Sequence, residues 1–179
     1  MVRKVAAERK LWISRDYLKC SGCRRCEIAC SLHHEGQIWP EASRIRVFML
    51  VPGVEIPHFC AQCREYYCVN ACPFEALSVD EKTSAVIVDK NKCTACGACI
   101  KACPGKIPHI HPKENYALIC DLCKGDPKCV KACEKAGFNA LRLVKEFPSI
   151  HRSLFARTPE DLTCDVAENL YAEKAEEVI

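Results

Sequence analysis

The placement of the cysteines constrains this 179-residue chain more than any other feature. Sixteen of its 17 cysteines fall into four quartets, each confined to a stretch of 11 to 14 residues. The quartets are Cys20, Cys23, Cys26 and Cys30; Cys60, Cys63, Cys68 and Cys72; Cys93, Cys96, Cys99 and Cys103; and Cys120, Cys123, Cys129 and Cys133. Each begins C-x2-C and ends C-x3-C, and only the gap between the two pairs varies. This internal repeat predicts four related sites built from thiols.

The rest of the composition favours reduced thiols over a disulfide scaffold. The N-terminal stretch is charged and has no apolar core of a secretory signal, and no stretch is apolar for long enough to span a bilayer. We therefore expect a cytoplasmic protein with no membrane span, in which thiols stay reduced. The net charge of +3 comes from basic residues spread along the chain, which predicts no nucleic-acid partner.

The spacing within a quartet indicates how its thiols are held. The C-x3-C ending predicts a short helix with both thiols on one face, so that Cys99 and Cys103 would lie about 6 Å apart along the helix axis. The first three cysteines are expected on a loop. This is the arrangement of ferredoxins, in which the fourth cysteine binds the second cluster of a pair. Zinc is the alternative, although zinc ribbons separate their C-x2-C pairs by a long loop.

The segments between the quartets read as short strands. Residues 75–79 and 85–89 flank a polar turn and predict a hairpin that links the second and third quartets. Residues 44–51 predict a further strand, and residues 109–119 a second hairpin. The stretches KLWIS before the first quartet and NALRLV after the fourth are also strand-like. If these two pair, the fold is α+β, with two ferredoxin-like two-cluster halves and the second half inserted in the first.

A C-terminal helical extension follows this repeat. Thr158, Pro159 and Asp161 predict a capped helix start, and Leu162, Val166 and Leu170 recur four residues apart on one face. This face packs either on the protein's own core or on a partner subunit. The lone Cys164 lies here and is expected to be a packing residue.

The quartets resemble those of a known family, the four-cluster ferredoxin-like electron-transfer subunits of the dimethyl sulfoxide reductase beta-subunit type. The likeness covers about residues 11–145 and rests on the sixteen cysteines, on CDLCKGDPKCV and on CVNACPFEAL. A narrower likeness, carried by CRRCEIACSLHHEGQIWPEASRIRV, is to the small polyferredoxin subunit of tungsten-containing aldehyde oxidoreductases and the related benzoyl-coenzyme A reductase system. Prolines follow the second and third quartets, whereas Ser31 and Glu134 follow the first and fourth.

The resemblance implies four 4Fe-4S clusters with crossed ligation. The quartets of the family pair first with fourth and second with third. The implied sets are Cys20, Cys23, Cys26 with Cys133; Cys120, Cys123, Cys129 with Cys30; Cys60, Cys63, Cys68 with Cys103; and Cys93, Cys96, Cys99 with Cys72. The implied domains are an outer unit of residues 1–58 and 110–146, an inserted unit of residues 59–109, and a linker with the C-terminal helix over residues 147–179.

Complete cysteine sets leave no iron open to a substrate, so we expect electron transfer and no catalysis. The six histidines are not needed as ligands: His33, His34, His58, His109, His111 and His151. Nearby cations could offset the cluster charge: Arg24, Arg25, Lys92, Lys101 and Lys131. The expected partners are a catalytic oxidoreductase subunit with tungsten or molybdenum, most simply an aldehyde oxidoreductase, and a ferredoxin or other redox partner in an anaerobic cell. A free polyferredoxin and a zinc-bound interaction module are the alternatives.

Overall fold

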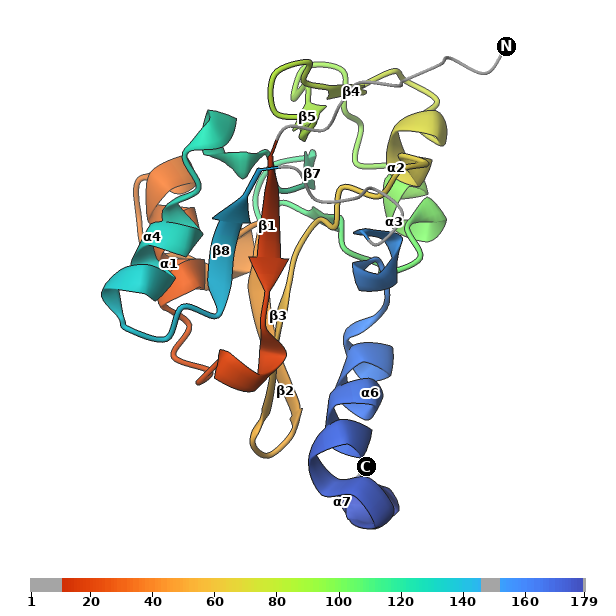
Figure 1. Cartoon of the computed structure of the whole chain (residues 1–179). Helices are drawn as coiled ribbons and strands as arrows, with labels where there is room; N and C mark the ends of the chain where they lie inside the picture. The colour runs from red at the N-terminus through yellow and green to blue at the C-terminus, as the bar shows by residue number, and fades with distance from the viewer. Residues whose placement is uncertain (1–10, 146–151, 179) are drawn as a thin grey trace.

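The chain combines short helices with four small antiparallel sheets, as shown in Figure 1. The computed structural model describes residues 11–145 and 152–178. The strands are β1 (Trp12–Arg15), β2 (Arg46–Val51), β3 (Val54–His58), β4 (Leu77–Val79), β5 (Val86–Val88), β6 (His109–Ile110), β7 (Ala117–Leu118) and β8 (Leu141–Val144). The α-helices are α1 (Arg25–Glu35), α2 (Tyr67–Asn70), α3 (Ala98–Ala102), α4 (Lys128–Lys135), α6 (Pro159–Tyr171) and α7 (Ala175–Val178). His151 and the start of the predicted linker lie outside the described residues.

The first and last strands of the cluster-binding region pair with each other. Strand β1 runs antiparallel to β8, with Trp12 opposite Val144 and Arg15 opposite Leu141. The predicted pairing of KLWIS with NALRLV is therefore confirmed. This pairing joins the segment before the first quartet to the segment after the fourth. Helix α1 packs against α4 beside this sheet (Figure 1). Cysteines of the first and fourth quartets consequently share one buried core.

The second and third quartets share a separate core. The predicted hairpins are both present, β4 with β5 and β6 with β7, although their strands are shorter than the predicted ranges. Helices α2 and α3 pack together. Cys68 and Cys99 are buried in one cluster with Leu77, Val86 and Ile119.

Strand β3 was not predicted, because its sequence contains residues that rarely form strands. Strand β2 confirms the strand predicted at residues 44–51, and β3 runs antiparallel to it with Val47 opposite Pro57. A proline donates no ladder hydrogen bond and usually argues against a strand. Here the sheet has only two strands, so β3 has one free edge where a missing donor is tolerated. Gly53 makes the turn with φ of +80°.

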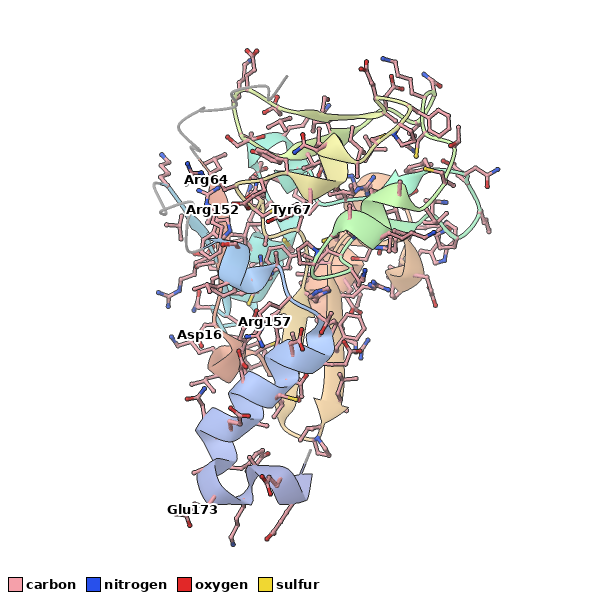
Figure 2. The ribbon with its side chains drawn as sticks, turned by 90° about the vertical axis from the view of Figure 1, so that its right-hand side faces the viewer. Asp16, Arg64, Tyr67, Arg152, Arg157 and Glu173 are labelled. Atoms are coloured by element: carbon pink, nitrogen blue, oxygen red, sulfur yellow. The ribbon has the colours of Figure 1, made fainter. Side chains whose placement is uncertain are left out.

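Helix α6 packs on the β2–β3 hairpin, which answers the question of what its apolar face buries. The Thr158 hydroxyl caps the helix by accepting from the Asp161 amide at 3.2 Å, as predicted. Leu162 and Val166 pack against Val54 and Ile56. Figure 2 shows the helix lying across the strands, with Arg157 just before its start.

The prediction that Leu170 shares this face is wrong, since its side chain is 47% exposed. Residues four apart drift by about 40° per step, so a third member turns well away from the first. Helix α7 continues past the tip of the hairpin (Figure 1), and Tyr171 makes the last contact, donating to the Pro52 carbonyl at 3.1 Å.

We also compared the helices with the length of a bilayer. In residues 11–145 and 152–178, none is both long and apolar enough to span one.

Candidate iron-sulfur site

The helices that carry the last two cysteines of each quartet differ between the outer and inner quartets. Cys26 and Cys30 lie within α1, and Cys129 and Cys133 within α4, as the spacing predicts. The expectation that the first three cysteines lie on a loop is wrong for the third of each quartet, because Cys68 and Cys99 also lie within helices, α2 and α3. Cys72 and Cys103 instead lie beyond the ends of α2 and α3. The prediction that Cys99 and Cys103 share one helix is therefore wrong.

Proline explains this difference. Cys72 and Cys103 each precede a proline, which disfavours helical backbone at the residue before it. Cys103 accordingly has extended backbone with φ of −76° and ψ of 121°. Ser31 and Glu134 occupy the proline positions in the other two quartets and let α1 and α4 continue. Ser31 is fully buried, and its hydroxyl accepts from the Trp39 amide at 3.1 Å.

The loops between the first two cysteines share one unusual backbone conformation. The residue before the second cysteine has a positive φ in all four quartets: Gly22, Gln62, Ala95 and Leu122, at +66°, +50°, +56° and +56°. For a residue with a side chain this costs roughly 1–2 kcal/mol. Backbone that alternates in this way turns successive amides toward a common point and forms anion-binding concavities, which iron-sulfur sites use. The strain recurs where a negatively charged cluster would sit.

Three of the four predicted cysteine sets line pockets of their own. Cys20, Cys23, Cys26 and Cys133 line one. Cys72, Cys93, Cys96 and Cys99 line a second. Cys30, Cys120, Cys123 and Cys129 line a third. Each pocket takes three cysteines from one quartet and the last cysteine of another.

The fourth set is brought together without such a pocket. Burial raises the pKa of three thiols of the second quartet, and Cys103 is close enough for its negative charge to raise it further: Cys60, Cys63 and Cys68. All four combinations therefore follow the crossed arrangement that the family resemblance implies. That each set binds one cluster stays a prediction.

Burial raises the pKa of several quartet thiols. It raises the pKa of Cys26 and Cys68 to about 12, and that of Cys99 and Cys123 to about 11, with nearby thiolates contributing. The pKa of Cys129 rises further still for the same reasons. Such thiols stay protonated at neutral pH unless a metal displaces the proton. The donor set therefore fits a group that binds thiolates, and binding it releases protons.

Backbone amides point at several of the sulfur atoms. The Gln62 amide donates to Cys60 Sγ at 3.4 Å within its loop. Amides from outside the loops also contribute: Arg44 to Cys30 at 3.3 Å, Ala76 to Cys72 at 3.4 Å and Ala117 to Cys93 at 3.4 Å. Hydrogen bonds to sulfur are among the terms that set the potential of a cluster. Backbone amides are therefore placed to offset cluster charge, in addition to the cations named from the sequence.

The described histidines bind mostly to protein groups. His58 Nε2 lies 3.0 Å from the Arg157 carbonyl and His109 Nδ1 lies 3.5 Å from the Ile107 carbonyl. His111 Nε2 lies 3.4 Å from Glu35. These contacts are ordinary hydrogen bonds to protein groups, and that no histidine binds iron stays a prediction.

His34 is the histidine nearest to a quartet cysteine. Its Nε2 lies 3.7 Å from Cys123 Sγ and 3.4 Å from Asp121. His33, His34 and Cys123 also have their donor atoms within 4.8 Å of one another, close enough to share a metal ion. Cys123 is already a member of a complete cysteine set, so we assign no separate metal to this group.

The cations proposed from the sequence lie mainly at the surface. Arg24 is half-exposed and pairs with Glu27 at 3.5 Å, and Lys131 pairs with Asp126.

Arg15 was not identified from the sequence, although it is only 6% exposed and lies between two cysteine sets. The sequence feature that could have indicated its burial is the alternation in WISR, which predicts that Arg15 lies on the same face of the strand as Ile13. Cys164 is partly buried on α6, as expected for a packing residue.

Two sequence signatures of known domain families match the chain. Residues 59–107 match a 4Fe-4S dicluster domain, and residues 17–32 match a 4Fe-4S binding domain. Both are iron-sulfur domains, which favours iron-sulfur clusters over zinc. Among curated proteins, the aliphatic sulfonate oxidoreductase polyferredoxin-like subunit of Pyrococcus furiosus is 54% identical over 93% of this chain and 96% of that protein. The chain belongs to this polyferredoxin-like family.

Further relatives are more distant. The thiosulfate reductase electron transfer subunit PhsB of Salmonella typhi is 31% identical over 66% of this chain and 68% of its own length. A chain in the solved structure of the active site complex BamBC of benzoyl coenzyme A reductase with benzoyl-CoA is 22% identical, with a TM-score of 0.46. That alignment covers 93% of this chain and 96% of the other, and a likeness this loose supports no inference.

Proposed function

We propose that the chain is the electron-conducting subunit of a larger oxidoreductase and holds four 4Fe-4S clusters in its four cysteine sets. The clusters, when bound, accept and pass on single electrons. The observation that carries this proposal is the grouping of all sixteen quartet cysteines into four crossed sets of four. With four thiolates in each set, the chain leaves no position for a substrate.

The cysteine exposure supports a series of sites with two ends. Cys23 and Cys96 are exposed, and they belong to two different sets. The other two sets contain no exposed cysteine, and they adjoin at Cys60 and Cys120: burial, and after it the charge of Cys60, raises the pKa of the Cys120 thiol. We propose the order Cys23 set, Cys120 set, Cys60 set, Cys96 set. In this proposal the outer unit of residues 1–58 and 110–146 holds the first two, and the inserted unit of residues 59–109 the last two.

Each exposed end also carries an aromatic side chain suited to a partner. Phe138 is 39% exposed and lines the pocket of the Cys23 set. Phe74 is 47% exposed and lines the pocket of the Cys96 set. Exposed aromatic groups are enriched where proteins bind one another. We propose that a catalytic subunit binds at one end, and that a ferredoxin or a further subunit binds at the other.

The catalytic partner that we propose contains tungsten or molybdenum, on the resemblance given above. The name of the 54% identical relative adds aliphatic sulfonates to the substrate classes to be tested, beside aldehydes. A free polyferredoxin that diffuses between enzymes is the alternative. It has the same clusters and no stable partner.

Anaerobic affinity purification from the native cell at endogenous level tests this proposal. We expect a large subunit to copurify and to carry tungsten or molybdenum by elemental analysis. Phe138→Asp and Phe74→Asp form a matched pair, of which one should release the large subunit while both keep the full iron content. A chain that emerges alone, fully loaded and active as a soluble carrier would favour the free polyferredoxin. Deleting residues 158–179 is a poor comparison, because α6 is part of the protein's own core.

A further inference from the structure

Arg15 is a buried cation at the junction of the two innermost cysteine sets. It ends β1, and its side chain reaches away from the surface so that only 6% of the residue is exposed. Its Nη1 donates to the Phe59 carbonyl at 3.0 Å and its Nη2 to the Cys60 carbonyl at 3.4 Å. The guanidinium lies over the Phe59 ring at 3.7 Å and near the Phe155 ring at 5.3 Å. Packing on both sides therefore fixes its position.

The described residues pair this cation with no acidic side chain. Among the ion pairs within residues 11–145 and 152–178, none includes Arg15. Its Nε is also buried without a hydrogen-bond partner in that part of the chain. Burying an unpaired charge is costly, and arginine is rarely buried unless it is paired. Within the part of the chain that the structure describes, no carboxylate pairs with this buried charge.

The groups that face the guanidinium identify its partner. Its Nη2 donates to the Cys60 carbonyl, and the Phe59 ring that the guanidinium covers lines the pocket of the Cys120 set. Cys60 and Cys120 belong to different sets, one in each proposed unit. When these thiols hold clusters, the negative charge on both sides of Arg15 is larger than in the metal-free chain.

We propose that Arg15 is the counter-charge between the two inner clusters and raises both of their reduction potentials. The inference rests on the proposed cluster sets. Each reduction adds one electron from an external donor to one cluster and takes up no proton, so the negative charge beside Arg15 grows by one. Arg15 stays protonated throughout and stabilises the reduced state. Electrons passing between the two units thus meet a favourable charge where the units join.

Redox titration of the anaerobic holoprotein, followed by electron paramagnetic resonance (EPR), tests this inference. In Arg15→Gln, the ratio of reduced to oxidised inner clusters at a fixed potential should fall about tenfold, which is about 59 mV for a one-electron couple. Arg15→Lys keeps the charge and should retain most of the native potential. Arg142→Gln is the matched control, since this arginine is exposed on the paired strand β8. It should leave the inner potentials unchanged, because solvent screens it.

A second pair of variants avoids removing Arg15 itself. Tyr17→Glu sets a carboxylate beside the guanidinium and should lower the inner potentials, whereas the uncharged Tyr17→Gln should not. Iron content distinguishes a failure of the proposed function from a failure of the role of Arg15. Wild-type protein without four clusters overturns the proposed function. Fully loaded Arg15→Gln and Tyr17→Glu with native potentials overturn only the role of Arg15. An equal fall in Arg15→Gln and Arg15→Lys would also overturn it, because hydrogen bonding rather than charge would then be responsible.

Discussion

Cys103 belongs to the third quartet in sequence, but in the fold its charge acts on the thiols of the second. Replacing it by serine therefore tests crossed ligation directly. The variant removes one sulfur from the set of Cys60, Cys63 and Cys68, and leaves the set of Cys93, Cys96, Cys99 and Cys72 complete. Cys103 lies outside α3, so the change should leave the helix intact.

The expected loss of iron follows from the number of sets. Four clusters of four irons hold about 16 irons, so each set accounts for about a quarter. Cys103→Ser should lose between about one iron, if the cluster survives with three, and about four, if it is lost. Cys99→Ser is the matched variant, because it lies four residues away and should damage the other set by the same amount.

Double variants show which cluster each cysteine serves. Two changes in one set should not add, whereas changes in separate sets should. Cys103→Ser combined with Cys60→Ser should lose no more than about four irons, and combined with Cys93→Ser up to about eight. Anaerobic iron and sulfide analysis with EPR is the assay. The reverse pattern, with additivity for Cys60 and none for Cys93, would mean that each quartet closes on a single cluster.

Three further predictions concern stability and the lone cysteine. Burial lowers the pKa of His58 from 6.5 to about 4, so between these pH values the unfolded chain binds more protons than the folded chain. The free energy of unfolding therefore falls as the pH falls through this range, by about 2 kcal/mol at pH 5. His58→Gln should flatten this pH dependence in thermal unfolding. Leu162→Ala should destabilise the fold by about 2–5 kcal/mol, whereas the exposed Leu170→Ala should change it by less than about 0.5 kcal/mol in the same melts. Cys164→Ser should keep the full iron content and all EPR signals, and any loss of iron would make this cysteine a ligand.

The repeat of the cysteines could be read from the sequence, and so could the elements that follow from strong local patterns. The strands at 75–79, 85–89 and 44–51, the hairpin at 109–119 and the Thr158 cap all depend on neighbouring residues. Strand β3 was not predicted, because Pro57 within it is a signal against a strand, which the free edge of a two-stranded sheet tolerates. The Pro52–Gly53 turn before it is a signal that could have been used.

The details of the site depend on contacts that local patterns do not encode. The prolines after Cys72 and Cys103 were visible, and their effect on the preceding helices could have been derived from backbone sterics. The role of Arg15 could not be assigned from the sequence, since it arises from contacts with Phe59 and Cys60, which lie 44 and 45 residues away. The amides of Arg44 and Ala117 lie 14 and 24 residues in sequence from the sulfurs that they contact.

The iron, acid-labile sulfide and zinc content of the anaerobic full-length chain tests the central claim most directly. The protein should be produced with complete iron-sulfur assembly and measured beside quantitative EPR of the reduced form. The account predicts about 16 irons with equal sulfide, little zinc, and spins from four clusters. About eight irons would show that only one pair of sets is loaded. A protein rich in zinc and free of sulfide would contradict the account.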